Sequence, residues 1–268
     1  MASSRPVRAA KIGVVTRVEQ LTPHMVRVVV GGEGLAGLGA GDYTDHYVKV
    51  LFPPAGVSYP EPFDVAAIRE SMPREAWPVV RTYTIRRWLP EEQEMWIDFV
   101  VHGDAGIAGP WAARAKPGDP FRFMGPGGGY APDPAADWHL LAGDESALPA
   151  IAASLEALPA GASAHAVILV ENEAEEQQIV TKADAQITWL HRSAGDDLVS
   201  AVRALPWRDG VVQAFVHGEA GFVRELRRYL LDERGMPREL LSISGYWRLG
   251  KNDEAWREEK AAERAREK

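Results

Sequence analysis

The chain has 268 residues, no cysteine and a formal net charge of −8 at pH 7. The absence of cysteine excludes disulfides, thiolate zinc sites and cysteine-held iron–sulfur clusters, so redox chemistry would need an organic cofactor or a metal that arrives with the substrate. The negative charge argues against general nucleic-acid binding, which needs a basic surface. No apolar run approaches the roughly 20 residues of a membrane span, and the start has no apolar signal segment, so a cytoplasmic protein is expected.

The first half of the chain is rich in short strands separated by Gly- and Pro-containing turns. The predicted strands are residues 13–18, 25–30, 46–52, 79–86, 95–101 and 121–124. This pattern is typical of a barrel or sandwich. A Pro-rich segment over 53–78 interrupts it and contains a short predicted helix near 64–71. The Gly-rich segment 125–130 is interpreted as a flexible connection to the second half.

After residue 132, predicted strands alternate with predicted helices. The strands are residues 138–142, 164–170, 187–191, 211–216 and 240–244, and the helices are 148–158, 197–205 and 221–233. Such alternation predicts a parallel sheet covered on both faces, which binds ligands beyond the carboxyl ends of its strands. The expected domains are 1–132, 133–250 and a charged helical tail over 251–268, for which a solvated helix is favoured over a lid.

The most informative segment is the predicted strand Arg81-Thr82-Tyr83-Thr84-Ile85-Arg86. Guanidinium groups can hold phosphate oxygens, an aromatic ring can lie against an isoalloxazine, and a hydroxyl can bond a ring nitrogen. Alternation puts Arg81, Tyr83 and Ile85 on one face of the strand. The alternative, from this segment alone, is an edge strand with solvated arginines.

A second segment joins a strand through small residues to a short helix that is predicted over 111–115. It runs from Asp98 through His102 and then from Gly106 through Gly109 to Trp111. Backbone N–H groups at such a helix start suit a pyrophosphate. The alternative is a turn that needs glycine for its positive φ.

Three further segments follow strands of the second half: 143–146, 218–219 and 246–247. Their positions suit a nucleotide bound at the edge of a parallel sheet. The alternatives are a helix cap by Asp144 or Ser146 and, for Tyr246 and Trp247, packing between domains. The seven histidines show no metal-ligand spacing, so no built-in metal site is expected.

Together these segments resemble the siderophore-interacting protein family, a flavin-dependent branch of the ferredoxin-reductase-like superfamily. The resemblance extends from Arg8 to Trp256 and is carried by residues 46–53, 81–86, 98–103, 141–151, 218–224 and 245–250. It implies an N-terminal antiparallel β-barrel that holds FAD and a C-terminal doubly wound parallel-sheet domain that binds NAD(P)H.

The resemblance also implies roles for individual residues. Tyr83 and Thr84 would be catalytic, with Thr84 near the reactive flavin nitrogen. The flavin and its phosphates would contact Arg81, Thr82, Tyr83, Thr84, Asp98, Val100, His102, Gly106, Ala108, Gly109 and Trp111. The nicotinamide side and the flavin face would involve Gly143, Asp144, Glu145, Ser146, Gly218, Glu219, Tyr246 and Trp247. An anionic ferric complex would be attracted by Lys49, Arg248 and Lys251.

The implied activity is reduction of ferric siderophores by NADH or NADPH through FAD. A general flavin, quinone or ferric-chelate reductase and a non-catalytic siderophore carrier are the alternatives. The acidic run that begins at Glu171 favours a ribose hydroxyl, whereas Arg192 could accept a 2′-phosphate. A ferredoxin donor stays open, and a monomer is expected. Gly109 and Gly127 stand where the family often has a serine and a basic residue, which weakens one phosphate contact and the basicity of the substrate pocket.

Overall fold

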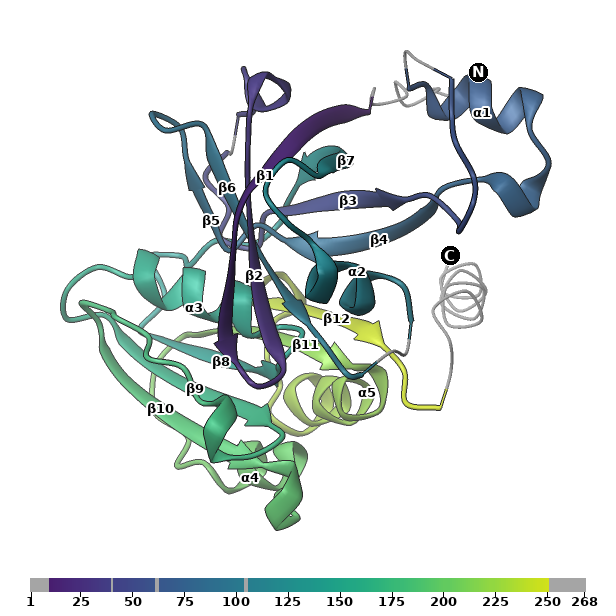
Figure 1. Ribbon diagram of the computed structural model, residues 1–268. Coiled ribbons are helices and arrows are strands. Elements are labelled where there is room, and N and C mark those ends of the chain that lie inside the picture. The colour runs from purple at the N-terminus through teal and green to yellow at the C-terminus, as the bar shows by residue number, and fades with distance from the viewer. Residues whose placement is uncertain (1–9, 40, 61–62, 104–105, 251–268) are drawn as a thin grey trace, which may run out of the picture. The chain divides into compact units, whose positions relative to one another are not determined.

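A computed structural model describes residues 10–39, 41–60, 63–103 and 106–250. The predicted tail and Lys251 lie outside these residues. The chain divides into two compact units on either side of the Gly129–Tyr130 bond, and both are drawn in Figure 1. Among the helices of the described ranges, none combines the length and apolar composition that a bilayer crossing requires.

The first unit is an antiparallel sheet of seven strands. They are β1 (Lys11–Thr22), β2 (Met25–Gly31), β3 (Tyr47–Phe52), β4 (Val79–Thr84), β5 (Arg87–Leu89), β6 (Glu94–Val100) and β7 (Pro120–Gly127), in the order β4-β3-β7-β1-β2-β6-β5. Just after β4, the Ile85 N–H donates to the carbonyl of His46 and the Arg86 N–H to that of Trp96. The chain therefore bridges the two sides of the sheet, β4 contacts β6, and the sheet closes into the predicted barrel.

The barrel core comes from inward-facing apolar residues of these strands. Val28, Val48 and Phe99 are among its fully buried members. Helix α2 (Ala108–Arg114) adds Trp111, whose ring centroid lies 5.6 Å from that of Phe99. Helix α1 (Val65–Ser71) forms a satellite cluster outside the barrel, where Ile68 packs with Leu51 of β3.

Two segments of the sheet in the first unit differ from the sequence-based expectation. The prediction of a flexible connection was wrong for residues 125–127, because β7 continues through them and Gly127 pairs with Tyr47 of β3. Strand β5 was not predicted, because three residues are too few to show alternation. It exists through pairing with Glu94–Trp96 of β6.

The second unit is a parallel sheet of five strands. They are β8 (Trp138–Asp144), β9 (Ser163–Val170), β10 (Asp184–His191), β11 (Val212–Glu219) and β12 (Leu241–Trp247), in the order β10-β9-β8-β11-β12. Every ladder between these strands is parallel, which confirms the predicted doubly wound class.

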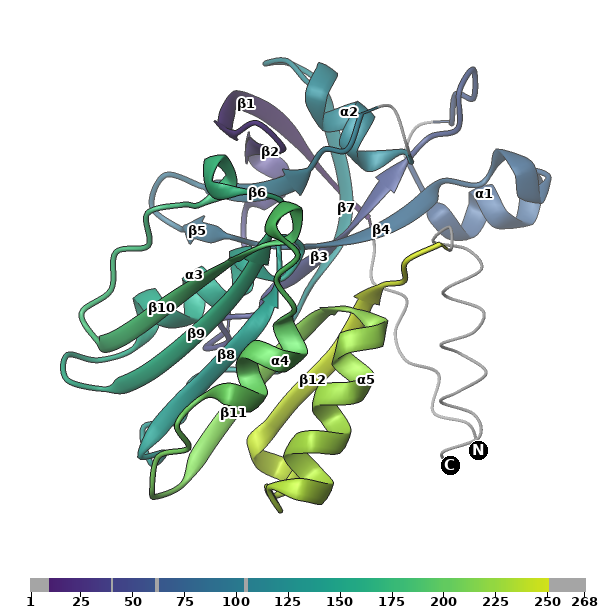
Figure 2. The ribbon, with the colours of Figure 1, turned by 90° about the horizontal axis from the view of Figure 1, so that it is seen from below.

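Helices cover both faces of this sheet, as Figure 2 shows. Helices α4 (Leu198–Ala204) and α5 (Ala220–Arg228) pack on the face that carries Leu140 and Ala142 of β8. Helix α3 (Leu148–Ala157) packs on the other face, where a Cβ at Gly143 would lie 3.2 Å from Ile151. The carboxyl ends of all five strands therefore share one edge, at which the polar residues predicted for a nucleotide gather.

Candidate functional site

The predicted flavin motif occupies β4. The register pairs Arg81 with Val50 and Tyr83 with Val48, so both share the face of β4 that turns toward the barrel core. The ring centroid of Tyr83 lies 4.2 Å from that of Phe99, at an interplanar angle of 39°. Thr84 ends the strand and is 8% exposed. An aromatic ring, a guanidinium and a hydroxyl thus lie along a single strand.

Strand β4 lies where the barrel closes, and the closing hydrogen bond comes from Arg86 just after the strand. It pairs with β3 on one side, and none of the described strands forms a ladder on its other side. The buried Nε2 of His46 has no hydrogen-bond partner among the described residues, and the carbonyl of His46 accepts from Ile85 directly after the motif. Burial lowers the pKa of His46 below its ordinary value, which favours the neutral imidazole. The buried ring nitrogen of His46, which has no partner among the described residues, is a polar atom near the end of the motif that a hydrogen-bonding cofactor would satisfy.

The β6 residues predicted to contact the flavin divide into buried and exposed positions. Asp98 is 4% exposed, and both its carboxylate oxygens accept from Arg27 at 2.7 and 2.8 Å. His102 is exposed, with its ring centroid 6.1 Å from that of His24. Val100 ends β6 and is half-buried. Asp98 therefore has a structural partner already, and its role toward a flavin stays a prediction.

The small-residue turn leads into α2 earlier than predicted. Gly106 has a φ of +79°, and the helix begins at the buried Ala108 rather than at Trp111. A Cβ at Gly109 would lie 3.0 Å from the carbonyl oxygen of Val100. Close packing of α2 against the end of β6 therefore explains why glycine suits position 109, where the family often has a serine.

The residues predicted to attract an anionic substrate lie on different elements. Lys49 is exposed on β3 opposite Thr82 and forms no hydrogen bond or ion pair among the described residues. Arg248 follows β12 and is half-buried. A side chain at Gly127 would collide with the ring of Tyr47, so a basic residue there would require that ring to move.

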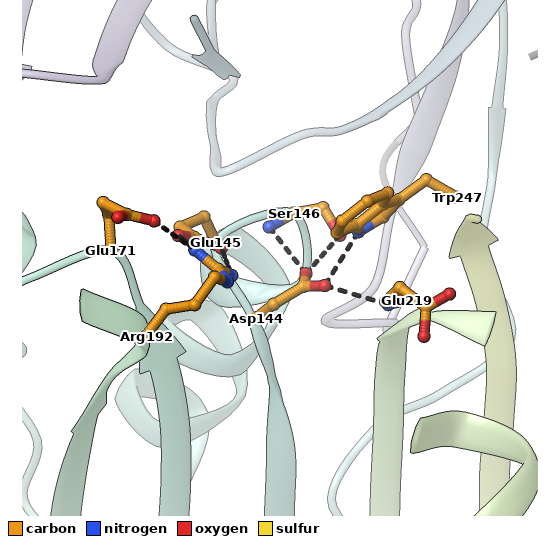
Figure 3. A network of polar contacts seen from close by, with 7 residues as sticks. All are labelled: Asp144, Glu145, Ser146, Glu171, Arg192, Glu219 and Trp247. Carbon is orange, nitrogen blue, oxygen red and sulfur yellow. Dashed lines mark hydrogen bonds and ion pairs between the residues drawn. The ribbon is translucent and has the colours of Figure 1, made fainter. Parts of the chain in front are cut away.

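At the carboxyl edge of the second unit, Asp144 joins three strand ends, as Figure 3 shows. Its Oδ1 accepts from the Ser146 N–H at 2.9 Å and from the Ser146 hydroxyl at 2.5 Å. Its Oδ2 accepts from the Glu219 N–H at 2.9 Å and from the Trp247 indole N–H at 2.8 Å. The carboxyl group thus links β8, β11 and β12 through neutral donors.

This environment makes Asp144 a titratable group near neutral pH. Burial raises its pKa to about 6, and the negative charge of Glu145 acts in the same direction. The bonds from Ser146, Trp247 and Glu219 oppose this rise in the pKa without cancelling it. A buried carboxyl group with a pKa in this range is a common feature of functional sites.

Beside Asp144, Arg192 connects two carboxylates. Its Nη1 and Nη2 donate to the two oxygens of Glu145 at 2.8 and 2.9 Å, and Nη1 also donates to Glu171 at 2.9 Å (Figure 3). The hydrogen bond to Glu145 is the main reason that the pKa of Arg192 lies above its ordinary value. Sequence reasoning considered Arg192 only as a phosphate ligand and missed the pairing with Glu145, because the two residues are far apart in the chain.

Two glycines predicted for the nucleotide side are required by packing. A Cβ at Gly143 would lie 2.5 Å from the carbonyl oxygen of His217, and Gly218 has a φ of +134° with the Asp144 carboxyl group where its Cβ would stand. Glu219 caps α5, since its carboxylate accepts from the N–H groups of Gly221 and Phe222. These residues shape the sheet edge whether or not they touch a ligand.

The aromatic residues predicted to cover a flat ring have contacts within the second unit. The His217 ring stacks on Phe215 with centroids 3.9 Å apart and lies 5.0 Å from the ring of Tyr246. The Nε2 of His217 lies 3.0 Å from the hydroxyl of Ser242. Trp247 donates its indole N–H to Asp144. The role of Tyr246 and Trp247 toward a flavin stays a prediction.

Family models match both halves of the chain in the order that the fold requires. Residues 14–130 match the siderophore-interacting FAD-binding domain, and residues 136–250 match the siderophore-interacting protein model. The two matches correspond to the barrel and the parallel sheet.

Relatives match nearly the full length. An uncharacterized protein of Mycobacterium tuberculosis is 44% identical, with 95% of each chain covered. The ferric vibriobactin reductase ViuB of Vibrio cholerae is 35% identical over 91% of each chain. The NADPH-dependent ferric-chelate reductase of Escherichia coli is 30% identical, over 87% of this chain and 91% of that protein.

Solved structures of other proteins are similar to the fold of this chain. A siderophore utilization protein from T. fusca has a TM-score of 0.78 and 37% identity, covering 91% of this chain and 94% of that one. The ferredoxin reductase of carbazole 1,9a-dioxygenase has a TM-score of 0.63 at 14% identity, covering 91% of this chain and 71% of that one, and so shares the fold. The predicted ferredoxin-reductase-like architecture is confirmed.

Proposed function

The chain belongs to the siderophore-interacting protein family, and we propose on this premise that it is an FAD-containing ferric-siderophore reductase that uses NADH or NADPH. The observation that carries the proposal is the end-to-end similarity, at 35% identity, to a ferric vibriobactin reductase. The flavin is assigned to the unit matched by the FAD-binding domain, and the nicotinamide nucleotide to the parallel-sheet unit. The domain boundary at residue 132 and the separate tail stay predictions.

Bound FAD would accept an electron pair from the nicotinamide and release single electrons to ferric iron, which remains in its chelator as substrate. The chain's own residues position and shield the cofactor. Tyr83 offers a ring that packs against Phe99, and Arg81 offers a cation on the same strand face. Thr84 would hold its hydroxyl toward the reactive end of the ring system, and its burial would keep water away from that end.

Substrate attraction needs positive charge but no protein ligand to the iron. Lys49 is exposed and unpaired among the described residues, so its full charge is available to an anionic complex. Such a local charge would raise the concentration of the substrate near the barrel despite the negative net charge of the protein.

Two other cations were predicted to take part in substrate attraction. Arg248 follows β12 in the second unit and is half-buried, which limits how closely a bulky complex could approach it. Lys251 lies outside the described residues. The part of both residues in substrate binding stays a prediction.

The test is one anaerobic titration of the purified full-length chain. The visible spectrum should show bound FAD, NADH or NADPH should bleach it, and a ferric siderophore added afterwards should restore it while a ferrous-iron dye develops colour. A colourless preparation that cannot be reconstituted with FAD would contradict the proposal. Bleaching without reoxidation by any ferric complex would contradict the reductase activity but not the flavin site.

A general ferric-chelate reductase is the second candidate, favoured by the 30% identity to the E. coli ferric-chelate reductase. Steady-state kcat/KM values for ferric siderophores, ferric citrate, free flavin and quinones separate the two candidates. A preference for siderophores supports the main proposal, and equal values support the general reductase. Tight binding of a ferric siderophore without NAD(P)H oxidation would instead indicate a carrier. A ferredoxin donor, a monomeric state and a cytoplasmic location stay predictions.

A further inference from the structure

The carboxyl edge of the parallel sheet carries a charged trio whose arrangement bears on the choice between NADH and NADPH. Glu145, Glu171 and Arg192 come directly after β8, β9 and β10, which are neighbours in the sheet. Ligands of such sheets bind beyond these strand ends, and an acidic residue there commonly binds the ribose of the nucleotide.

We propose that this trio selects a nucleotide without a 2′-phosphate, with Glu145 as the specificity-determining residue. The inference rests on the proposed function for its nicotinamide donor. Glu145 occupies the guanidinium fork of Arg192 with both oxygens, as a phosphate would. The group that could have recognised a 2′-phosphate is therefore already engaged.

The burial of Glu145 makes this engagement hard to reverse. Its side chain is 8% exposed, whereas that of Arg192 is 37% exposed. If Arg192 turned to a phosphate, Glu145 would remain as a buried carboxylate without its cation, which is strongly unfavourable. The trio also carries one more negative than positive charge, so a phosphate would meet repulsion.

Glu171 offers a hydrogen-bond acceptor for a ribose hydroxyl. Its side chain is 40% exposed, and only Oε2 accepts from Arg192. The other oxygen has no partner among the described residues and can accept a hydrogen bond from a ribose hydroxyl. A ribose with free hydroxyls is therefore accepted at this edge, and one with a 2′-phosphate is rejected.

The test measures binding rather than turnover. The FAD-loaded full chain is titrated calorimetrically with 5′-AMP and with 2′,5′-ADP, which differ only in the 2′-phosphate and cannot reduce the flavin. The wild-type chain should bind 5′-AMP at least about tenfold more tightly, the usual effect of one unfavourable charged contact. Equal or tighter binding of 2′,5′-ADP would overturn the inference.

Glu145→Gln removes the carboxylate charge and releases the fork of Arg192. It should tighten 2′,5′-ADP binding relative to 5′-AMP binding at least about tenfold. The matched control is Glu233→Gln, which removes the charge of the Arg203 partner from an exposed two-bond pair in the same unit and should change neither affinity. If the ratio of the 5′-AMP and 2′,5′-ADP affinities is unchanged in a folded, FAD-loaded Glu145→Gln chain, the role assigned to Glu145 is contradicted.

If Glu145→Gln does not fold, Glu171→Gln provides the test, because this variant keeps the buried carboxylate of Glu145. It should weaken 5′-AMP binding and lower the preference for 5′-AMP at least about fivefold. An unchanged preference would overturn the inference. If neither nucleotide binds the wild-type chain, the inference also fails, and the anaerobic reduction of FAD by NADH then shows whether the proposed function fails with it.

Discussion

Each half of the molecule buries an aspartate that the sequence singled out, and the two halves satisfy it differently. In the barrel, Asp98 faces the guanidinium of Arg27 with two bonds, and Arg27 itself lies 4.8 Å from the ring centroid of Trp96. In the parallel-sheet unit, Asp144 receives only neutral N–H and O–H donors and has Glu145 beside it.

The two carboxyl groups therefore have different roles. The Asp98 pair joins β2 to β6 through a fixed charge balance, so it serves the barrel. Asp144 holds three strand ends and accepts hydrogen bonds from neutral donors alone among the described residues, so its protonation can change close to the physiological range. Substitutions that alter each environment in turn test whether the two carboxyl groups differ in this way.

The largest effect is expected from Arg27→Met, which leaves Asp98 buried without its cation. Removing one partner of a buried pair costs about 3–5 kcal/mol of unfolding free energy. The matched control is Arg203→Met, which breaks an exposed pair with Glu233 of the same two-bond geometry and should cost far less. Urea denaturation of both variants checks this, and equal losses would show that burial does not distinguish the pairs.

The second prediction concerns the pH dependence of stability at Asp144. The pKa is about 6 in the folded chain against 3.8 for the ordinary group, so the folded state holds its proton more tightly than the unfolded state. The contribution of this proton to stability is complete below about pH 4, is lost as the pH rises through 6, and totals on the order of 2–3 kcal/mol.

The measurement is the difference in unfolding free energy between the wild type and Asp144→Asn at several pH values from 4 to 7. Because asparagine does not titrate, the difference isolates the carboxyl group from all other acids. A flat difference across this range would mean that the donors from Ser146, Glu219 and Trp247 balance the effect of burial.

The same contrast between partnered and unpartnered charges applies to two cations, Arg192 and Lys49. Arg192 is neutralised by two carboxylates, whereas Lys49 has no partner among the described residues. Lys49→Glu should raise KM for an anionic ferric tris-catecholate about five- to tenfold at low salt and leave bound FAD unchanged. Lys116→Glu makes the same charge change at another exposed position of the barrel unit and is expected to have little effect. Equal KM values for both variants would remove Lys49 from the substrate site.

The smallest effect is expected at Thr84, because the substitution removes a single hydroxyl group. Thr84→Val keeps the shape of the side chain and should slow reduction of FAD by the nicotinamide nucleotide about fivefold, as expected for loss of one hydrogen bond. Thr84→Ser should retain most of the rate. Stopped-flow absorbance of the flavin measures both, and similar rates for Val and Ser would show that the hydroxyl has no part in the reaction.

Most elements could be predicted because their patterns are local. The helix at α1 begins after Asp64, whose carboxylate accepts from the N–H groups of Ala66 and Ala67, as an N-cap does. The apolar run of β2 and the strand–helix alternation after residue 132 are equally local. Strand β5 and the end of β7 escaped prediction, because each depends on pairing with another strand rather than on its own pattern.

The order of the two folds, the absence of thiol chemistry and the family could be predicted without a structure, since composition, periodicity and motif order are properties of the linear chain. The partners of the charged groups, in contrast, became known from the folded structure. In the folded chain, Arg27 donates to Asp98, Arg192 donates to Glu145, and the indole of Trp247 donates to Asp144. The physical reason is that charges act through space, and folding brings together groups that lie 47 to 103 residues apart along the chain.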